Sequence, residues 1–357
     1  MTITKLYLQN FRNYKEEHLE LEEVNIIYGD NAQGKTNILE AIYMFSLGLS
    51  HRTYRDKEMI MFDKDTAKIG IEYVSHEMKH TSEIELDKRK KKLIKINGAQ
   101  VEKNSELIGK LNVVMFCPEH LSLVKEGPAA RRRNIDIFIS SLRPRYFSLL
   151  KQYKKLILNK NALLKKIKQN PRLEPTLAVW NEEVCKVGAE IIKYRQEYIK
   201  KLNEKCAAIH SKITVGKEML AVKYSRGESC SPELLMAEIQ KNYRRELDYA
   251  EALVGPHRDD IEFHINEREV KNYGSQGQQK TAVLSHKLAE VEIICEESGE
   301  YPVLLLDDIF SELDRHRRDY LLKNINNIQV FITCTDKEQF EKLPDCKMFH
   351  VKSGTAK

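Results

Sequence analysis

A glycine-rich turn near the N-terminus restricts the fold of this 357-residue chain more than any other segment. Residues 29–36 read GDNAQGKT and fit the pattern G-x-x-x-x-G-K-[ST] without a mismatch. A short apolar strand pattern at residues 24–28 precedes the turn, and a helical pattern with Ile38, Ile42 and Phe45 follows it. Strand, turn and helix in this order predict a phosphate-binding loop; the alternative is a chance glycine turn before a helix.

The chemistry of this loop gives its residues distinct roles. Glycines let the backbone curl so that successive N–H groups face the phosphates, and the helix N-terminus adds unpaired donors. Lys35 would supply a positive charge to the β- and γ-phosphates, and Thr36 would offer its hydroxyl to Mg²⁺. The predicted nucleotide-binding residues are Gly29, Asp30, Asn31, Ala32, Gln33, Gly34, Lys35, Thr36 and Asn37.

A second element places two acidic residues directly after a buried strand. Residues 303–306 are four apolar residues, and Asp307 and Asp308 follow them. Open α/β sheets bind ligands at the C-terminal edge of their strands, which is where these carboxylates would lie. We expect Asp307 to be a Mg²⁺ ligand, and Asp308 and Lys35 to be catalytic, with Asp308 orienting or deprotonating the attacking water. The alternative is a strand followed by a polar turn.

A third element is the glycine-containing turn at residues 273–280, YGSQGQQK, which opens a helix. It presents Ser275, Gly277 and Gln278 at a second helix N-terminus, and this predicts another anion site. The alternative is an ordinary N-capped helix with Ser275 as the cap.

Composition and patterning exclude several classes of protein. The net charge of +6 is mildly basic and permits a polyanionic partner. The longest apolar runs have the length of a strand, far below the roughly 20 residues of a membrane-spanning helix, and residues 1–6 lack the layout of a secretory signal. The seven cysteines form no C-x-x-C pair, so we expect no zinc site and a reduced, cytoplasmic protein.

The order of the patterns along the chain suggests two parts. Strand patterns dominate the first hundred residues, and Asn97-Gly98 predicts a hairpin turn. Two helical stripes meet at Asn170-Pro171, which predicts a pair of long helices joined by a turn. Strands and helices then alternate, which indicates a parallel sheet. The expected strands and helices there are residues 261–265, 277–297, 303–306, 315–326 and 330–332.

These three elements in this order resemble the ATPase heads of the ABC class and, within it, the bacterial RecF family of the ABC/SMC-type ATPase heads. Further stretches carry the resemblance to the RecF family. They are residues 8–14 (LQNFRNY), 116–121 (FCPEHL), 124–128 (VKEGP), 131–136 (RRRNID), 254–260 (VGPHRDD) and 305–314 (LLDDIFSELD). The resemblance implies an α/β fold, an ABC-type P-loop ATPase head with a mixed β sheet flanked by helices. The head would comprise residues 1–145 and 255–357, with a helical arm or lid subdomain at residues 146–254.

The resemblance also implies how such a chain works. Ser275, Gly277 and Gln278 match the ABC signature, which reads the γ-phosphate of an ATP molecule held by a second copy of the chain. ATP and Mg²⁺ would close a homodimer that clamps double-stranded DNA near single-strand gaps. The implied partners are gapped DNA and RecR with RecO, in support of RecA loading, and no membrane partner is expected. The protein would be a slow, DNA-stimulated ATPase in recombinational repair and replication restart.

Two positions depart from most ABC ATPases. Asp308 stands where most have glutamate, and its shorter reach makes slow turnover plausible. Thr333 and its neighbours occupy the switch region, where transporters usually place histidine. The Q-loop is expected at residues 116–119.

A basic stretch without acidic residues predicts a DNA-binding surface. Residues 137–173 contain ten Lys and Arg side chains and no Asp or Glu, and this single sign favours a track for phosphates over a mixed solvated face. The alternative is a solvated helix face. The DNA-binding candidates are Arg131, Arg132, Lys154, Lys155, Lys165 and Lys166.

Three rival functions stay open at this stage. An SMC-like DNA-repair head would need a much longer arm, and a transporter ATPase subunit would be favoured by a membrane protein that co-purifies with the chain. A small-molecule P-loop kinase would show an ATPase activity that depends on its substrate and ignores DNA.

Overall fold

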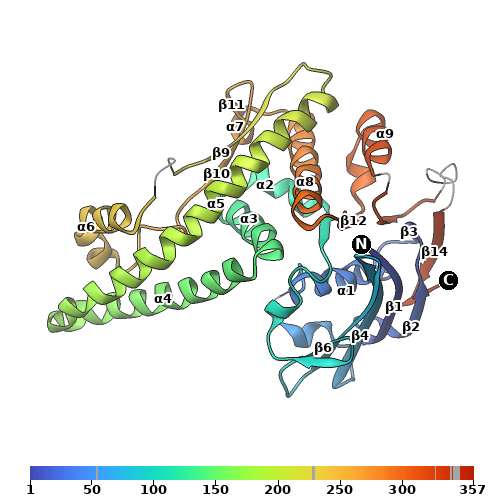
Figure 1. The fold of residues 1–357 in the computed structure, drawn as a ribbon, viewed down its shortest axis with the longest axis horizontal. Helices are drawn as coiled ribbons and strands as arrows, with labels where there is room; N and C mark the ends of the chain where they lie inside the picture. The colour runs from blue at the N-terminus through green and yellow to red at the C-terminus, as the bar shows by residue number, and fades with distance from the viewer. Residues whose placement is uncertain (54, 227–229, 326, 338–339, 341–345) are drawn as a thin grey trace. The chain divides into compact units, whose positions relative to one another are not determined.

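The computed structural model describes residues 1–53, 55–226, 230–325, 327–337, 340 and 346–357. The chain divides into two compact units (Figure 1). The first unit contains Met1–Leu121 and Val283–Lys357, and the second contains Ser122–Ala282. Residues 122–145 and 255–282, which the sequence-based division assigns to the head, therefore pack within the second unit. The predicted boundaries between an ATPase head and a helical arm stay a prediction.

The first unit contains an antiparallel sheet in the order β2-β1-β4-β5-β6-β7. Its strands are β1 (Thr2–Phe11), β2 (Tyr14–Glu20), β4 (Thr66–Ser75), β5 (Met78–Asp87), β6 (Leu93–Ile96) and β7 (Ala99–Val101). Alternate side chains of β1 and β4, such as Leu6, Leu8, Ile69 and Ile71, are buried, as a sheet with one covered face requires. Asn97 and Gly98 have φ angles of 50° and 80° between β6 and β7, so the predicted hairpin turn is confirmed.

The second sheet of this unit carries the loop that the sequence predicts to bind phosphates. Its order is β15-β14-β3-β13-β12-β8, and β14, β3, β13, β12 and β8 are mutually parallel. The strands are β3 (Val24–Tyr28), β8 (Val113–Phe116), β12 (Val303–Asp307), β13 (Val330–Cys334), β14 (Cys346–Lys352) and β15 (Thr355–Ala356). The predicted parallel α/β sheet is confirmed.

Helix α1 (Lys35–Leu47) shares one hydrophobic core with strands of both sheets. Ile38, Ile42 and Phe45 are all at most 1% exposed, so the apolar stripe of the sequence is the buried face of this helix. Two further helices belong to this unit in whole or in part, α8 (Gln276–Ser298) and α9 (Arg315–Asn324). The last residue of the predicted helix 315–326 lies outside the described residues.

The second unit is mainly helical. Its longer helices are α3 (Pro128–Leu142), α4 (Pro144–Gln169), α5 (Leu177–Ile213) and α6 (Pro232–Tyr249). Helices α4 and α5 lie side by side, joined by a short 3₁₀ turn at Pro171–Thr176, so the predicted helix pair is confirmed (Figure 1). A sheet in the order β11-β10-β9 completes the unit, with β9 (Leu220–Tyr224), β10 (Ile261–Ile265) and β11 (Arg268–Glu269).

Several shorter helical segments connect these elements. In the first unit they are the 3₁₀ helices η1 (Asp56–Met59), η2 (Asn104–Glu106), η3 (Pro118–Leu121) and η5 (Ile309–Glu312). In the second unit they are α2 (Ser122–Lys125) and α7 (Val270–Tyr273). Helix α7 follows β11 directly and leads into the turn at Ser275.

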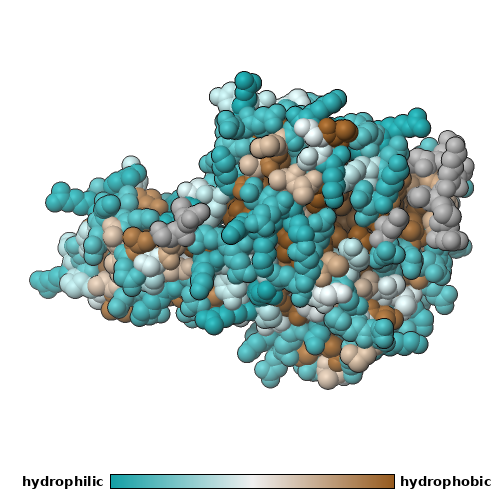
Figure 2. All heavy atoms as spheres, turned by 45° about the horizontal axis from the view of Figure 1, so that its top comes forward, coloured by the Kyte–Doolittle hydropathy of each residue, from teal (hydrophilic) through white to brown (hydrophobic). Residues whose placement is uncertain are grey.

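The surface is mostly polar on the face shown in Figure 2, with hydrophobic side chains in small patches between hydrophilic ones. Among the described residues, no helix is long and apolar enough to cross a membrane. The seven cysteines, all within the part of the chain that the structure describes, form no disulfide bond. The expected cytoplasmic location stays a prediction.

One lysine of the basic stretch is a core residue. Lys160 of α4 is fully buried, and its Nζ lies 2.7 Å from Oε2 of Glu246 on α6, which is also fully buried. This ion pair joins α4 to α6, so Lys160 does not belong to a surface track. Lys154 and Lys165 on the same helix are exposed.

We predict that Lys160→Met lowers the free energy of unfolding by about 3 kcal/mol, because it leaves the Glu246 carboxylate buried without its cation. Urea unfolding measures the change. The double variant with Glu246→Leu should recover most of the loss, and the exposed control Lys154→Met should change stability by no more than about 0.5 kcal/mol. Equal stabilities of the Lys160 and Lys154 variants would contradict the buried pair.

Candidate functional site

The loop at residues 29–36 has a shape that only glycine permits at two positions. Gly29 and Gly34 have φ angles of 145° and 119°. A Cβ atom on Gly29 would lie 2.4 Å from the carbonyl oxygen of Val351, and one on Gly34 would lie 2.6 Å from Nδ2 of Asn13. The two glycines therefore allow the backbone of the loop to curl and also allow the loop to pack closely on neighbouring segments.

Lys35 points back into this loop. Its Nζ donates hydrogen bonds to the carbonyl oxygens of Gly29, at 2.6 Å, and Asp30, at 2.9 Å. Burial lowers the pKa of the ammonium group, and the carboxylate of Asp308 is the strongest nearby charge that opposes this effect. The ammonium thus lies inside the curl of the loop, where the sequence predicts the phosphates.

Three segments meet at the C-terminal edge of the parallel sheet. The Thr36 hydroxyl donates to Oδ1 of Asp307 at 3.0 Å, and the Thr333 hydroxyl donates to the same oxygen at 2.7 Å. Burial raises the pKa of Asp307, and the two hydroxyl hydrogen bonds offset part of that rise. A hydroxyl and a carboxylate in direct contact are hard oxygen donors that suit Mg²⁺, so Thr36 and Asp307 fit the predicted ion.

Asp308 has an unusual backbone conformation next to this cluster. Its φ angle is 49°, a left-handed value that is uncommon outside glycine. Its N–H donates to the Thr333 hydroxyl at 2.8 Å, and its carbonyl accepts from the Ser311 hydroxyl at 2.7 Å. Thr333, in the predicted switch region, therefore connects both carboxylate residues.

Residues that the sequence analysis did not assign to the site hold the loop from outside. Asn13 donates to the carbonyl of Gln33 at 2.7 Å, and the Tyr14 hydroxyl donates to the carbonyl of Gly34 at 3.1 Å. From the far end of the chain, the Ser353 N–H donates to Oε1 of Gln33 at 2.7 Å. The Ser-Gly dipeptide at 353–354 is a turn signal, but no sequence pattern indicates that this turn lies against the loop.

Behind the loop, a buried carboxylate fixes the turn between β1 and β2 to helix α1. Arg12 donates to both oxygens of Glu40, at 2.8 and 2.6 Å, and the Ser50 hydroxyl also donates to Glu40. Burial favours the neutral acid, yet these hydrogen bonds hold the pKa of Glu40 below its ordinary value. Arg12 is part of the stretch LQNFRNY, so this stretch supports the loop.

The expected Q-loop region follows strand β8. Cys117 is buried, and its N–H lies 3.1 Å from Nδ1 of His120. Glu119 is the strongest negative charge acting on the pKa of Asp307. The region thus borders the Asp307 cluster, and its role stays a prediction.

The turn at Ser275 belongs to the second unit and begins helix α8. The Gln278 N–H donates to the Ser275 hydroxyl at 3.2 Å, and the Ser275 N–H donates to Oε1 of Gln278 at 2.9 Å. This reciprocal pair is a capping box, so Ser275 does cap the helix, and its side chain is also exposed. Ser275, Gly277 and Gln278 lie together here, while Lys35, Thr36, Asp307 and Asp308 lie together in the first unit.

The DNA-binding candidates separate into exposed and buried groups. Lys154, Lys155, Lys165 and Lys166 are exposed on α4. Arg131 is 5% exposed and donates to both oxygens of Asp260, at 2.7 and 2.8 Å. The assignment of Arg131 as a DNA contact is therefore wrong, because its guanidinium is used inside the fold.

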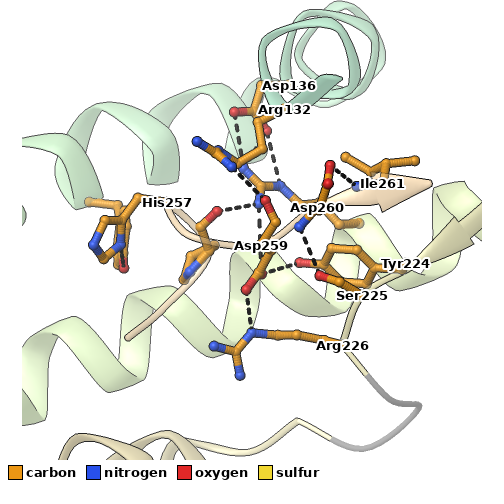
Figure 3. Close-up of polar contacts among 12 residues, drawn as sticks. Arg132, Asp136, Tyr224, Ser225, Arg226, His257, Asp259, Asp260 and Ile261 are labelled. Carbon is orange, nitrogen blue, oxygen red and sulfur yellow. Dashed lines mark hydrogen bonds and ion pairs between the residues drawn. The ribbon is translucent and has the colours of Figure 1, made fainter. Parts of the chain in front are cut away.

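Arg132 and the stretch VGPHRDD at residues 254–260 form a polar cluster within the second unit (Figure 3). Arg132 donates to the carbonyl of Asp259 at 2.6 Å, and the Asp259 carboxylate accepts from Tyr224 and Arg226, at 2.5 and 2.6 Å. Burial lowers the pKa of His257 to about 4, so this imidazole is neutral at physiological pH. The cluster ties α3, β9 and the 254–260 segment together, and half-buried Arg132 is a weak DNA candidate.

With this geometry in view, comparisons with known proteins identify relatives over the whole chain. The family described as RecF/RecN/SMC N terminal domain matches residues 2–357. The DNA replication and repair protein RecF of Acetivibrio thermocellus is 45% identical over 350 residues, which cover 96% of this chain and 95% of the relative. The protein of the same name from Clostridium tetani is 43% identical over 364 residues, with 99% of each chain covered.

Solved structures agree with these relatives. The structure of the recombination mediator protein RecF-ATPrS in the RecFOR pathway superimposes with a TM-score of 0.93 at 38% identity, and the match covers 99% of this chain and 97% of that one. The Smc head domain derived from Pyrococcus furiosus has a TM-score of 0.57 at 17% identity, covers 100% of this chain and 95% of that one, and shares the fold alone. The predicted ATPase-head fold is confirmed.

The C-terminal turn against the loop generates a test. Gly354 has a φ angle of 75°, and a Cβ there would lie 2.1 Å from the carbonyl oxygen of Asn13. We predict that Gly354→Ala weakens binding of a fluorescent ATP analogue about tenfold, because the Asn13 contact to the loop must shift.

Gly98→Ala is the matched control. Gly98 has a φ angle of 80° and nothing within 4 Å of the added Cβ, so this variant carries similar backbone strain without a clash. Equal affinities of the two variants would contradict a supporting role of the C-terminal turn.

Proposed function

We propose that this chain, which belongs to the RecF family within the RecF/RecN/SMC proteins, is an ATP-dependent DNA-binding protein of recombinational repair and replication restart. Its ATP-bound form is a homodimer that clamps duplex DNA near single-strand gaps. The relatives at 45% and 43% identity are DNA replication and repair proteins, and a relative at 37% identity has been solved as RecF-ATP in the RecFOR pathway.

The observation that carries the proposal is the cluster around the phosphate-binding loop. Lys35 lies within the loop, and Thr36 contacts Asp307 at 3.0 Å at the C-terminal edge of the parallel sheet. Backbone N–H groups of residues 29–36 bind the phosphates of ATP, and the Lys35 ammonium exchanges its carbonyl partners for phosphate oxygens. Bound Mg²⁺, held by Thr36 and Asp307, would neutralise charge on the β- and γ-phosphates.

ATP hydrolysis serves as a slow switch in this proposal. Asp308 accepts the proton of the attacking water or orients it, and its side chain is one methylene shorter than the glutamate of most ABC ATPases. The Ser275 turn contacts the γ-phosphate of ATP bound to a second copy of the chain, and this γ-phosphate is the group that ADP lacks. The dimer therefore closes with ATP and opens after hydrolysis.

The DNA-binding surface in this proposal is the exposed face of α4. Lys154 and Lys165 are eleven residues apart, about three helical turns, so they lie on the same face roughly 16 Å apart along the axis. Phosphates of duplex DNA bind such a row of charges without a requirement for sequence. RecR with RecO is the proposed protein partner, in support of RecA loading, because the solved relative belongs to the RecFOR pathway.

Replacement of the loop lysine tests the nucleotide switch. We predict that Lys35→Ala loses ATP-dependent dimerisation, because the phosphates lose their charge partner inside the loop. Sedimentation velocity with ATP, with ADP and without nucleotide measures the oligomeric state. The exposed control Lys57→Ala should dimerise with ATP as the unaltered chain does, whereas a Lys35→Ala variant that still dimerises would contradict the proposed switch.

Charge reversal on α4 tests the DNA surface. We predict that Lys154→Glu with Lys165→Glu lowers affinity for gapped duplex DNA at least about tenfold and reduces the slope of log affinity against log salt by about 2. The control Lys57→Glu with Lys64→Glu makes the same change in net charge at exposed positions of the first unit. An unaltered salt slope, or an equal loss in the control, would rule out α4 as the phosphate track.

A further inference from the structure

The Ser275 turn is held by a carboxylate that has no role in the proposed function so far. Nε2 of Gln278 donates to Oε1 of Glu218 at 2.9 Å. The other oxygen of Glu218, Oε2, lies 3.1 Å from Nε2 of His210. These side chains come from three places in the sequence: the last turn of α5, the segment before β9, and the first turn of α8.

The contact with Glu218 fixes the orientation of the Gln278 amide. Oε1 of Gln278 accepts the N–H of Ser275 at 2.9 Å, so the amide nitrogen must face the other way, toward Glu218. An ionised carboxylate only accepts hydrogen bonds, and a flipped amide would place its oxygen against that carboxylate. Glu218 therefore selects the one amide orientation that completes the capping box with Ser275.

The segment that carries Glu218, and the His210 side chain that contacts it, are both fixed within the fold. His210 is fully buried, and its carbonyl accepts the N–H of Thr214 at 2.9 Å at the end of α5. The N–H of Gly216 donates to the carbonyl of Ser211 at 2.8 Å, which closes the segment between α5 and β9. The Glu218 side chain is 23% exposed, so solvent competes only partly for its oxygens. Because Glu218 is held in this way, its hydrogen bond to Gln278 fixes the position of the Gln278 amide in the turn.

We propose that Glu218, oriented by His210, is a positioning residue for the Ser275 turn. The pair keeps the Ser275 N–H and hydroxyl in the geometry that contacts the γ-phosphate of a second copy of the chain. This inference rests on the proposed function of that turn. The position of the Glu218 oxygen Oε1, which accepts from Gln278, is the property that matters rather than the charge of the carboxylate. Binding of ATP by the loop at residues 29–36 does not depend on this contact.

Three substitutions of Glu218 distinguish the position of its acceptor oxygen from the charge of its carboxylate. Glu218→Ala removes the acceptor, and Glu218→Asp keeps the charge but shortens the side chain by one methylene. Glu218→Gln loses the charge but keeps an oxygen acceptor at the same distance, because its NH₂ group can donate to Nε2 of His210 in the tautomer protonated at Nδ1, which leaves the oxygen facing Gln278. We expect the Ala and Asp variants to weaken ATP-dependent dimerisation at least about tenfold, and the Gln variant to stay within about threefold of the unaltered chain.

A second Glu–His pair in the same unit provides the matched control. Nε2 of His264 lies 2.9 Å from Oε2 of Glu262, and both residues belong to strand β10 rather than to the Ser275 turn. Glu262→Ala should dimerise with ATP as the unaltered chain does. Affinity of the monomer for a fluorescent ATP analogue, measured below the dimerisation concentration, should be the same in all four variants.

Sedimentation velocity over a range of protein concentrations with ATP and Mg²⁺ decides the matter. Normal dimerisation of Glu218→Asp, or an equal loss in Glu218→Gln and Glu218→Asp, would overturn the positioning role. Should Glu218→Ala fail to fold, the comparison of the Asp and Gln variants still gives the answer.

A variant of the turn itself separates this inference from the proposed function. Ser275→Arg should abolish ATP-dependent dimerisation if the turn contacts a γ-phosphate. Loss in Ser275→Arg with normal dimerisation in Glu218→Asp would overturn the positioning role alone. Normal dimerisation of Ser275→Arg would overturn the proposed function of the turn, and the positioning role with it.

Discussion

The parallel register of β3, β13 and β12 is the constraint on which the nucleotide site depends. Parallel strands end at the same edge of a sheet, so the loop after β3, Thr333 at the end of β13 and Asp307 at the end of β12 are brought together. The shared hydrogen bonds of Thr36 and Thr333 to one oxygen of Asp307 are the direct result. A shift of one residue in either pairing would turn one of these side chains to the other face of the sheet.

The loop is also shaped by the two ends of the chain. The turn at Ser353 and Gly354, between β14 and β15, packs against Gln33 of the loop and against Asn13 in the turn after β1. Asn13 in turn donates a hydrogen bond to Gln33. Strand β14 pairs with β3 directly, which brings this C-terminal turn against a loop that lies more than 300 residues earlier. These contacts require the glycines of the loop as much as its curl does, since a Cβ on Gly29 would lie 2.4 Å from the carbonyl oxygen of Val351.

Buried charges organise the second unit in a different way. Arg195 is 2% exposed and contacts Asp136 and the carbonyl of Pro256, while Lys160 and Glu246 form a fully buried pair. Such groups are costly to bury unless each finds its partner, so they fix how the helices meet. The partly exposed carboxylate of Glu218 likewise contacts two elements, since it pairs with His210 at the end of α5 and with Gln278 at the start of α8. Charges that look alike in the sequence thus divide into those that hold the fold and those, such as Lys165, that face solvent.

The sequence by itself determined the strand, glycine turn and helix around residues 29–36, the two acids after β12, the turn that opens a helix at Ser275 and the long helix pair, because each depends on neighbouring residues and a short period. It did not reveal strand β14, the Gly354 contact or the Glu218–Gln278 contact, since these join segments distant along the chain. Only the tertiary structure decided which basic residues are available: Lys160 and Arg131 resemble their exposed neighbours in sequence, and burial beside Glu246 and Asp260 separates them. Burial depends on packing between elements, which local patterns do not encode.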